Sequence, residues 1–174
     1  MSLRGSVRAH RVEVTEKVEE IAEPDYASTF EVIVPDTDVR SPERWARAMF
    51  EDAPRAIRWF VVAGWKYALC FRLGPRASSA HVLGWKILAS TPDSIGLELR
   101  SPLVSAHKVL RVEGSRIRVT TVVRYERRIA RALWTAATPI HHRTEPYLLG
   151  HAASHPPSAG QGARARAMSP VSRP

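Results

Sequence analysis

Residues 116–125 read RIRVTTVVRY and show the clearest pattern in the chain. Apolar side chains, threonine and tyrosine occupy every second position, and arginine holds three of the five positions between them. This alternation predicts a β-strand with one face in the core and the other in solvent. The residues expected to face the core are Ile117, Val119, Thr121, Val123 and Tyr125.

Other segments show similar strand patterns. Residues 83–88, 95–100 and about 103–112 precede this strand, and 113–115 has the composition of a hairpin turn. Residues 26–34 predict the first strand of the sheet. Strands that are adjacent in the chain usually pair, so we expect an antiparallel sheet. In 103–112 neither alternate set of side chains is cleanly apolar, which leaves open the face that points inward.

Helices are predicted on both sides of the strand region. Ser41-Pro42-Glu43 is typical of a helix start, because serine caps the first turn, proline fits it and the acid favours the helix dipole. Asp52-Ala53-Pro54 separates this short helix from a second, whose apolar spacing continues to Ala68. Residues 128 to about 151 predict a long C-terminal helix with a broad apolar stripe.

This order of elements predicts an α+β fold. The last helix is the only element large enough to cover one face of the antiparallel sheet. A curved sheet wrapped around that helix leaves a space, and a mostly apolar pocket suits a flat or lipidic molecule. The predicted ligand-binding residues are Trp85, Leu97, Leu99, Thr121, Val123, Tyr125, Leu133, Trp134, Ile140 and His141. The alternative is that these side chains simply fill the core.

The length of 174 residues favours one folded domain. We place it at residues 24–152, after an N-terminal extension at 1–23. Residues 153–174 are rich in Pro, Gly, Ala and Arg and have almost no large apolar side chains. This composition predicts a disordered tail.

Four stretches carry a family resemblance: Asp25-Tyr26-Ala27, SAHKVLRV at 105–112, RVTTVVRY at 118–125, and Pro139-Ile140-His141. Through them the chain resembles the START-like superfamily, also called SRPBCC or helix-grip, which includes polyketide cyclases, plant pathogenesis-related proteins and lipid carriers. Within it, the chain resembles an uncharacterised bacterial domain-of-unknown-function family. The resemblance implies a helix-grip fold, with two short helices after the first strand, and a hydrophobic ligand. It implies no mechanism, because no catalytic residue is established across that family.

The chain departs from that family in its last helix. Ala130-Arg131 replaces the usual Gly-Arg, Leu133 stands where the family has Tyr, and Ile140 replaces Phe.

The net charge of +9 raises the question of a nucleic-acid partner. Most of the basic excess is spread over residues 24–152 and is not gathered in one arm. Aromatic residues interleaved with arginine on an exposed face, which nucleic-acid binding by stacking needs, are not evident in the sequence. Nucleic acid is therefore a disfavoured partner.

The sequence also bears on compartment and cofactors. The longest apolar run, 59–65, is too short for a membrane span of about twenty residues, and no signal-peptide pattern is visible. The single cysteine, Cys70, excludes an intramolecular disulfide and a multi-cysteine zinc site. We predict a cytoplasmic protein with no membrane insertion, no metal site and no cofactor, since no Walker or dinucleotide glycine motif occurs. The oligomeric state is not predicted.

His141 and Tyr125 are the candidate catalytic residues. The ordinary pKa of histidine lies near neutrality, which suits His141 to acid–base chemistry, and Glu145 follows on the same helical face. One feature of the sequence counts against catalysis, and the position of another group stays open. The predicted inward positions hold no Asp or Glu. His107, with Lys108 and Arg111, is either an entrance feature or an ordinary outer-face residue, because the register of its strand is ambiguous.

We therefore expect the chain to bind or carry a hydrophobic small molecule, lipid- or polyketide-like, between the sheet and the last helix. The alternative is a cyclase- or dehydratase-type enzyme on the same scaffold that uses His141 or Tyr125. A basic nucleic-acid-binding protein is the third hypothesis.

Overall fold

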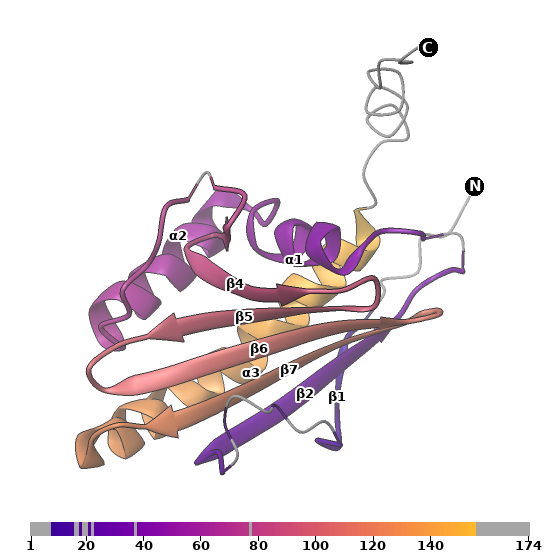
Figure 1. Ribbon diagram of the computed structural model, residues 1–174. Coiled ribbons are helices and arrows are strands. Elements are labelled where there is room, and N and C mark those ends of the chain that lie inside the picture. The colour runs from indigo at the N-terminus through magenta and orange to yellow at the C-terminus, as the bar shows by residue number, and fades with distance from the viewer. Residues whose placement is uncertain are drawn as a thin grey trace, which may run out of the picture.

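The computed structural model describes residues 8–15, 18, 21, 23–36, 38–76 and 78–155. They form a mixed α+β structure in which an open antiparallel sheet lies against a long C-terminal helix and shorter helices (Figure 1), as predicted. The sheet has seven strands in the order β1-β2-β7-β6-β5-β4-β3. The strands are β1 (His10–Val12), β2 (Tyr26–Ile33), β3 (His81–Val82), β4 (Trp85–Ser90), β5 (Ser94–Arg100), β6 (Val104–Glu113) and β7 (Arg116–Tyr125).

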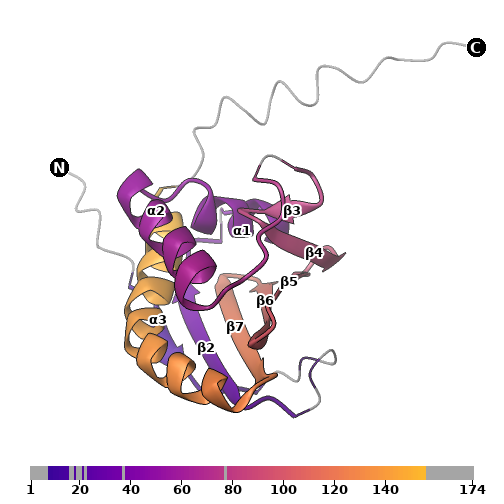
Figure 2. The same ribbon diagram turned by 90° about the vertical axis from the view of Figure 1, so that its left-hand side faces the viewer.

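The helical segments are α1 (Pro42–Phe50), α2 (Arg55–Ala63), the π-helical segment η1 (Gly64–Ala68) and α3 (Arg128–Ser154). Helix α3 lies against β2 and β7 (Figure 2), whereas α1 lies against β5 and β6 and also contacts α3. The two helices therefore cover different parts of the sheet, and this division decides which inward side chains are packed in the core.

The predicted helix signals are confirmed at the start of α1. The Ser41 hydroxyl accepts a hydrogen bond from the Arg44 backbone N–H at 3.3 Å, and Pro42 begins the helix. The second predicted helix consists of two segments, because the α-helical turns end at Ala63 and π-helical pairing follows. Helix α3 continues to Ser154, past its predicted end, with both Pro139 and Pro146 inside it.

The prediction for residues 116–125 is confirmed on the inward face. The side chains of Ile117, Val119, Thr121 and Val123 are at most 1% exposed. The outward face differs from the prediction, because Thr120 and Val122 are also buried. Val18 and Ile21 from the N-terminal extension pack on Val122, so this part of the outer face is covered.

Described residues of the N-terminal extension and of the predicted tail add to the sheet and to the last helix. Strand β1, which lies within the predicted extension 1–23, pairs with β2 as an edge strand. Of the predicted tail at 153–174, only 153–155 belong to the described residues, and Ser154 ends α3. Among the described residues, no helix combines the length and apolar composition needed to cross a membrane.

The strand predicted at 83–88 begins later, at Trp85. Leu83 and Gly84 instead form the turn between β3 and β4, with φ angles of 45° and 90°. Glycine is needed at 84 because this φ is left-handed and an added Cβ would lie 3.1 Å from the Leu73 Cβ.

The pairing of β6 shows which of its two faces points inward, which the sequence left open. Lys108 lies opposite Leu97 of β5 and Thr121 of β7, so it shares their inward face. Its side chain is buried, with 3% of the residue exposed. Of the two faces that the sequence left open, Lys108 therefore takes the inward one and His107 the outward one.

Candidate functional site

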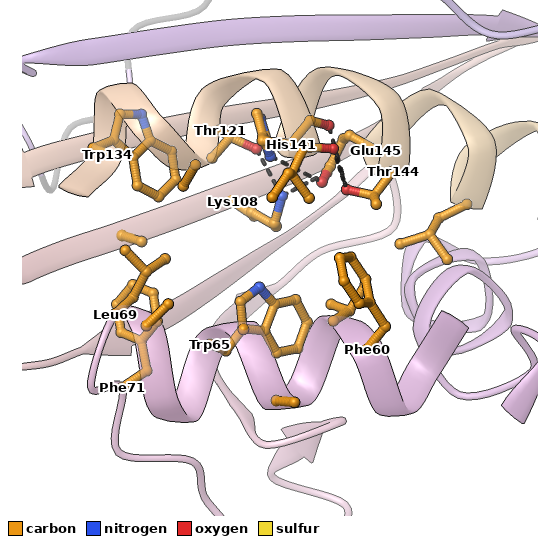
Figure 3. Close-up of a pocket in the computed structure, with 18 of the residues that line it drawn as sticks. Phe60, Trp65, Leu69, Phe71, Lys108, Thr121, Trp134, His141, Thr144 and Glu145 are labelled. Atoms are coloured by element: carbon orange, nitrogen blue, oxygen red, sulfur yellow. Dashed lines mark hydrogen bonds and ion pairs between the residues drawn. The ribbon is translucent and has the colours of Figure 1, made fainter. Parts of the chain in front are cut away.

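A cavity of about 260 Å³ lies between α3, the α2–η1 segment and the inner face of β6 and β7 (Figure 3). Its wall is mostly apolar, with aromatic side chains from several elements. Small residues leave the volume open: Ala63, Gly64 and Ala68 line one side and Ala137 the other. A Cβ built on Gly64 meets no atom within 4 Å.

Aromatic rings form the wall opposite the inner part of α3. Figure 3 shows Phe60 and Trp65 across the cavity from Lys108, His141 and Glu145. The ring centroids of Trp65 and Trp85 are 5.5 Å apart, in an edge-to-face arrangement that is favourable for aromatic pairs. The π-helical segment places Trp65 in this wall, and such segments occur frequently at functional sites.

A buried polar cluster stands on the other wall. The Lys108 Nζ lies 2.5 Å from the Glu145 Oε1 and donates a second hydrogen bond to the Thr121 Oγ1 at 2.8 Å. Both charged side chains are only 4% exposed. Burial lowers the pKa of Lys108, and the Glu145 carboxylate partly opposes this effect.

His141 extends the cluster toward β2. Its Nδ1 lies 3.6 Å from the Glu145 Oε2, and its Nε2 lies 3.2 Å from the Ser28 hydroxyl oxygen. The pKa of His141 is lowered to about 4, chiefly by burial; the Glu145 carboxylate opposes this effect and the Lys108 charge adds to it. The imidazole is therefore neutral at pH 7. His142, next in sequence, instead pairs with the Tyr26 hydroxyl at 2.7 Å.

Two indole N–H donors at the cavity lack a hydrogen-bond acceptor among the described residues. They are the buried N–H groups of Trp85 and Trp134. Both residues line the cavity. A buried donor without a partner costs about 1–3 kcal/mol, so each needs an explanation.

The structure brings half of the predicted ligand-binding residues to this cavity. The lining residues among them are Trp85, Thr121, Trp134, Ile140 and His141. Leu97, Leu99 and Val123 are buried in the core instead, and Leu97 and Leu99 lie on β5, which α1 covers. Leu133 is partly buried outside the cavity.

Tyr125 is separated from His141. It lines a different depression, with Asp25 and Arg131. Burial raises the pKa of Tyr125, and the Asp25 charge adds to the effect. The two candidate catalytic residues thus do not belong to one site.

Sequence reasoning did not predict that Lys108 and Glu145 pair at the cavity. The inward strand positions hold no acid, but Glu145 of α3 supplies one, which corrects the expectation of a pocket without Asp or Glu. Its predicted place on the His141 face of the helix is confirmed by the 3.6 Å contact. Lys108 alternates along its strand with Val104, Ala106 and Leu110. Because alternate residues of a strand share a face, this apolar set was the signal in the sequence that Lys108 points inward.

Comparison of the chain with protein-family models, with curated proteins and with solved structures gave no match. In the part of the chain that the structure describes, no three His, Cys, Asp or Glu side chains gather in a way that could hold a metal ion.

The Lys108–Glu145 pair predicts a strong coupling in stability. Lys108→Met or Glu145→Gln leaves one buried charge unpaired, and we expect each to lower the free energy of unfolding by about 3–5 kcal/mol. The double variant removes both charges and should lose much less than the sum. Urea denaturation of the four proteins measures the coupling. A double variant that loses the full sum would show that the two groups act independently.

His141 predicts a pH-dependent stability. Its pKa is about 4 in the folded chain and near 6.5 when unfolded, so the unfolded state binds more protons between these values. Stability should therefore fall as the pH drops from about 6.5 to about 4, by on the order of 3 kcal/mol. His141→Gln should flatten this part of the curve. Denaturation at several pH values tests it, and equal slopes in both proteins would contradict it.

Proposed function

We propose that the chain binds or carries a small hydrophobic molecule in the cavity between the sheet and the C-terminal helix. The observation that carries the proposal is an unfilled, mostly apolar volume of about 260 Å³. A partly open, mostly apolar pocket bordered by aromatic rings, with a few polar groups on one wall, is the usual form of a small-molecule site.

The wall also supports a ligand with some polar character. Lys108, Thr121 and His141 stand on one side, and the Trp85 and Trp134 indoles lack partners. An acceptor atom on the ligand within reach of either indole would remove part of the cost of that buried donor. The cavity volume lies just below the range of about 300–1,000 Å³ usual for drug-sized ligands. We therefore infer a compact lipid- or polyketide-like molecule with one polar end.

The order of elements supports the same proposal. A long C-terminal helix against an antiparallel sheet, with two short helices after the strand that begins at Tyr26, agrees with the helix-grip arrangement of START-like proteins. In that arrangement the space between helix and sheet holds the ligand. We propose that the chain is a member of this superfamily.

Filling the cavity should block binding. Ala137→Phe places a large side chain in the cavity wall, whereas Ala136→Phe places the same ring at a neighbouring exposed position of α3. We expect saturable, salt-insensitive binding of the neutral dye N-phenyl-1-naphthylamine by the native chain. Ala137→Phe should weaken it about tenfold or more, a loss of at least ~1.4 kcal/mol, while Ala136→Phe leaves it unchanged.

Dye fluorescence and tryptophan quenching measure these affinities. Equal binding by both phenylalanine variants would place the dye elsewhere and count against the proposal. Binding that collapses with salt would favour a polyanion site instead. Native mass spectrometry of protein from its own source identifies the molecule that co-purifies.

A second candidate is a cyclase- or dehydratase-type enzyme on the same scaffold. The specific observation that favours it is His141, which is neutral, lines the cavity and lies beside Glu145. A neutral imidazole is able to accept a proton from a bound substrate. Tyr125 has no part in this version, because it lies outside the cavity.

Turnover separates the two functions. If the chain is an enzyme, His141→Ala should reduce turnover of a polyketide-like substrate by about 10²–10⁴-fold, with dye affinity retained. His142→Ala is the matched control, since His142 is the neighbouring histidine and does not line the cavity. Unchanged turnover in His141→Ala, with the fold intact by circular dichroism, would remove His141 from the mechanism.

A further inference from the structure

The identity of the buried cation is unexpected for this chain. The sequence contains twenty-two arginines and four lysines. Of the lysines, Lys66 and Lys86 are exposed, whereas Lys108 is 3% exposed and lines the cavity. Arginine is generally preferred for buried ion pairs, since its planar group makes several hydrogen bonds and remains charged. A lysine amine differs because it is able to lose its proton and act as a nucleophile.

The surroundings of the Lys108 amine are suited to that role. Glu145 and Thr121 receive two of its three N–H groups, and no described residue takes the third. The Nζ lies 5.5 Å from the Trp85 ring centre and 5.8 Å from that of Phe50. Trp65 and Phe60 face it across the open volume (Figure 3). A molecule held against these rings would present its polar end to the amine.

We infer that Lys108 forms a reversible Schiff base with an aldehyde or ketone group of an apolar ligand. This inference rests on the proposed function, because it requires that the ligand occupies the same cavity. It adds a chemical class, a carbonyl compound, and a covalent step to what was proposed above.

The step balances through Glu145. The carboxylate takes one proton from the Lys108 ammonium, and the nitrogen lone pair then attacks the carbonyl carbon. A C–N bond forms, the C=O π pair moves to oxygen, and the Glu145 proton passes to that oxygen. The nitrogen gives its second proton to Glu145, which passes it to the hydroxyl; the C–O bond then breaks, water leaves, and the nitrogen lone pair forms the C=N bond. The net reaction is ammonium plus carbonyl giving protonated imine plus water, with Glu145 returned as the carboxylate and no oxidant or reductant.

Burial assists this sequence. It lowers the pKa of Lys108 and so raises the share of neutral amine near pH 7. The groups that face the amine are Glu145 and His141 from α3 and Thr121 from β7.

Reductive trapping tests the inference on the full native chain. 2-Naphthaldehyde with sodium cyanoborohydride at pH 7 should convert the imine to a stable secondary amine, located by peptide mapping. Because the cavity would hold the aldehyde beside the amine, and burial lowers the pKa of Lys108, Lys108 should be labelled about ten times faster than Lys66 or Lys86. 2-Methylnaphthalene, which has no carbonyl, should slow labelling of Lys108 alone.

Two further proteins sharpen the result. Lys108→Met/Glu145→Gln removes the pair together and should lose the fast adduct, while Ala136→Phe keeps it. Labelling of Lys108 at the rate of the exposed lysines, or none, would overturn the inference. Saturable binding of 2-methylnaphthalene with no Lys108 adduct would overturn the covalent step and leave the ligand-binding proposal intact. If neither saturable binding of 2-methylnaphthalene nor a Lys108 adduct is observed, the ligand-binding proposal and the Schiff-base inference are both overturned.

Discussion

The ion pair between Lys108 and Glu145 is the constraint on which the rest of the site depends. It joins the middle of β6 to α3 across the face of the sheet, and both groups are nearly free of solvent. Bringing two charges out of water costs several kcal/mol each, and only close pairing with further hydrogen bonds offsets that cost. Thr121 supplies one of these bonds from β7. The pair therefore holds α3 at one position along the strands, and the position of α3 determines the cavity.

The two sides of the sheet next to the ion pair differ in how closely they are packed. On the β5 side, α1 packs tightly, and Trp45, Met49 and Ile95 are fully buried. On the β6–β7 side, the cavity wall facing α3 combines small residues, Ala63, Gly64 and Ala68, with aromatic rings, and the volume stays open. The same sheet thus supports a close-packed core at one end and an open cavity at the other. Rigid support next to an open space is what positions a polar group for a ligand.

Much of this arrangement follows from sequence pattern. Alternation identified the inward residues of β7, the Ser41–Pro42 signal located α1, and the long C-terminal helix was expected from Arg128. Helical spacing placed Glu145 beside His141. Each of these features depends on residues close together in the chain.

The cavity itself depends on distant residues. Strand alternation shows that Leu97 and Leu99 face inward but not which helix covers them, and α1 takes that place. Lys108 alternates with apolar residues along β6, which suggests an inward position. A buried lysine, however, is stable only when it is paired with an opposite charge or hydrogen-bonded. That partner is thirty-seven residues away on α3. Pattern reasoning does not supply this pairing, since it requires the position of α3.

The sheet ends in very short strands on both sides. β1 has three residues and β3 has two, so the outermost strands offer only a few backbone N–H and C=O groups. Long, flat edges serve as templates on which another chain adds a strand, and short edge strands give little to pair with. Extension of this sheet from one molecule into the next through its outermost strands is therefore disfavoured, which limits one common route to aggregation.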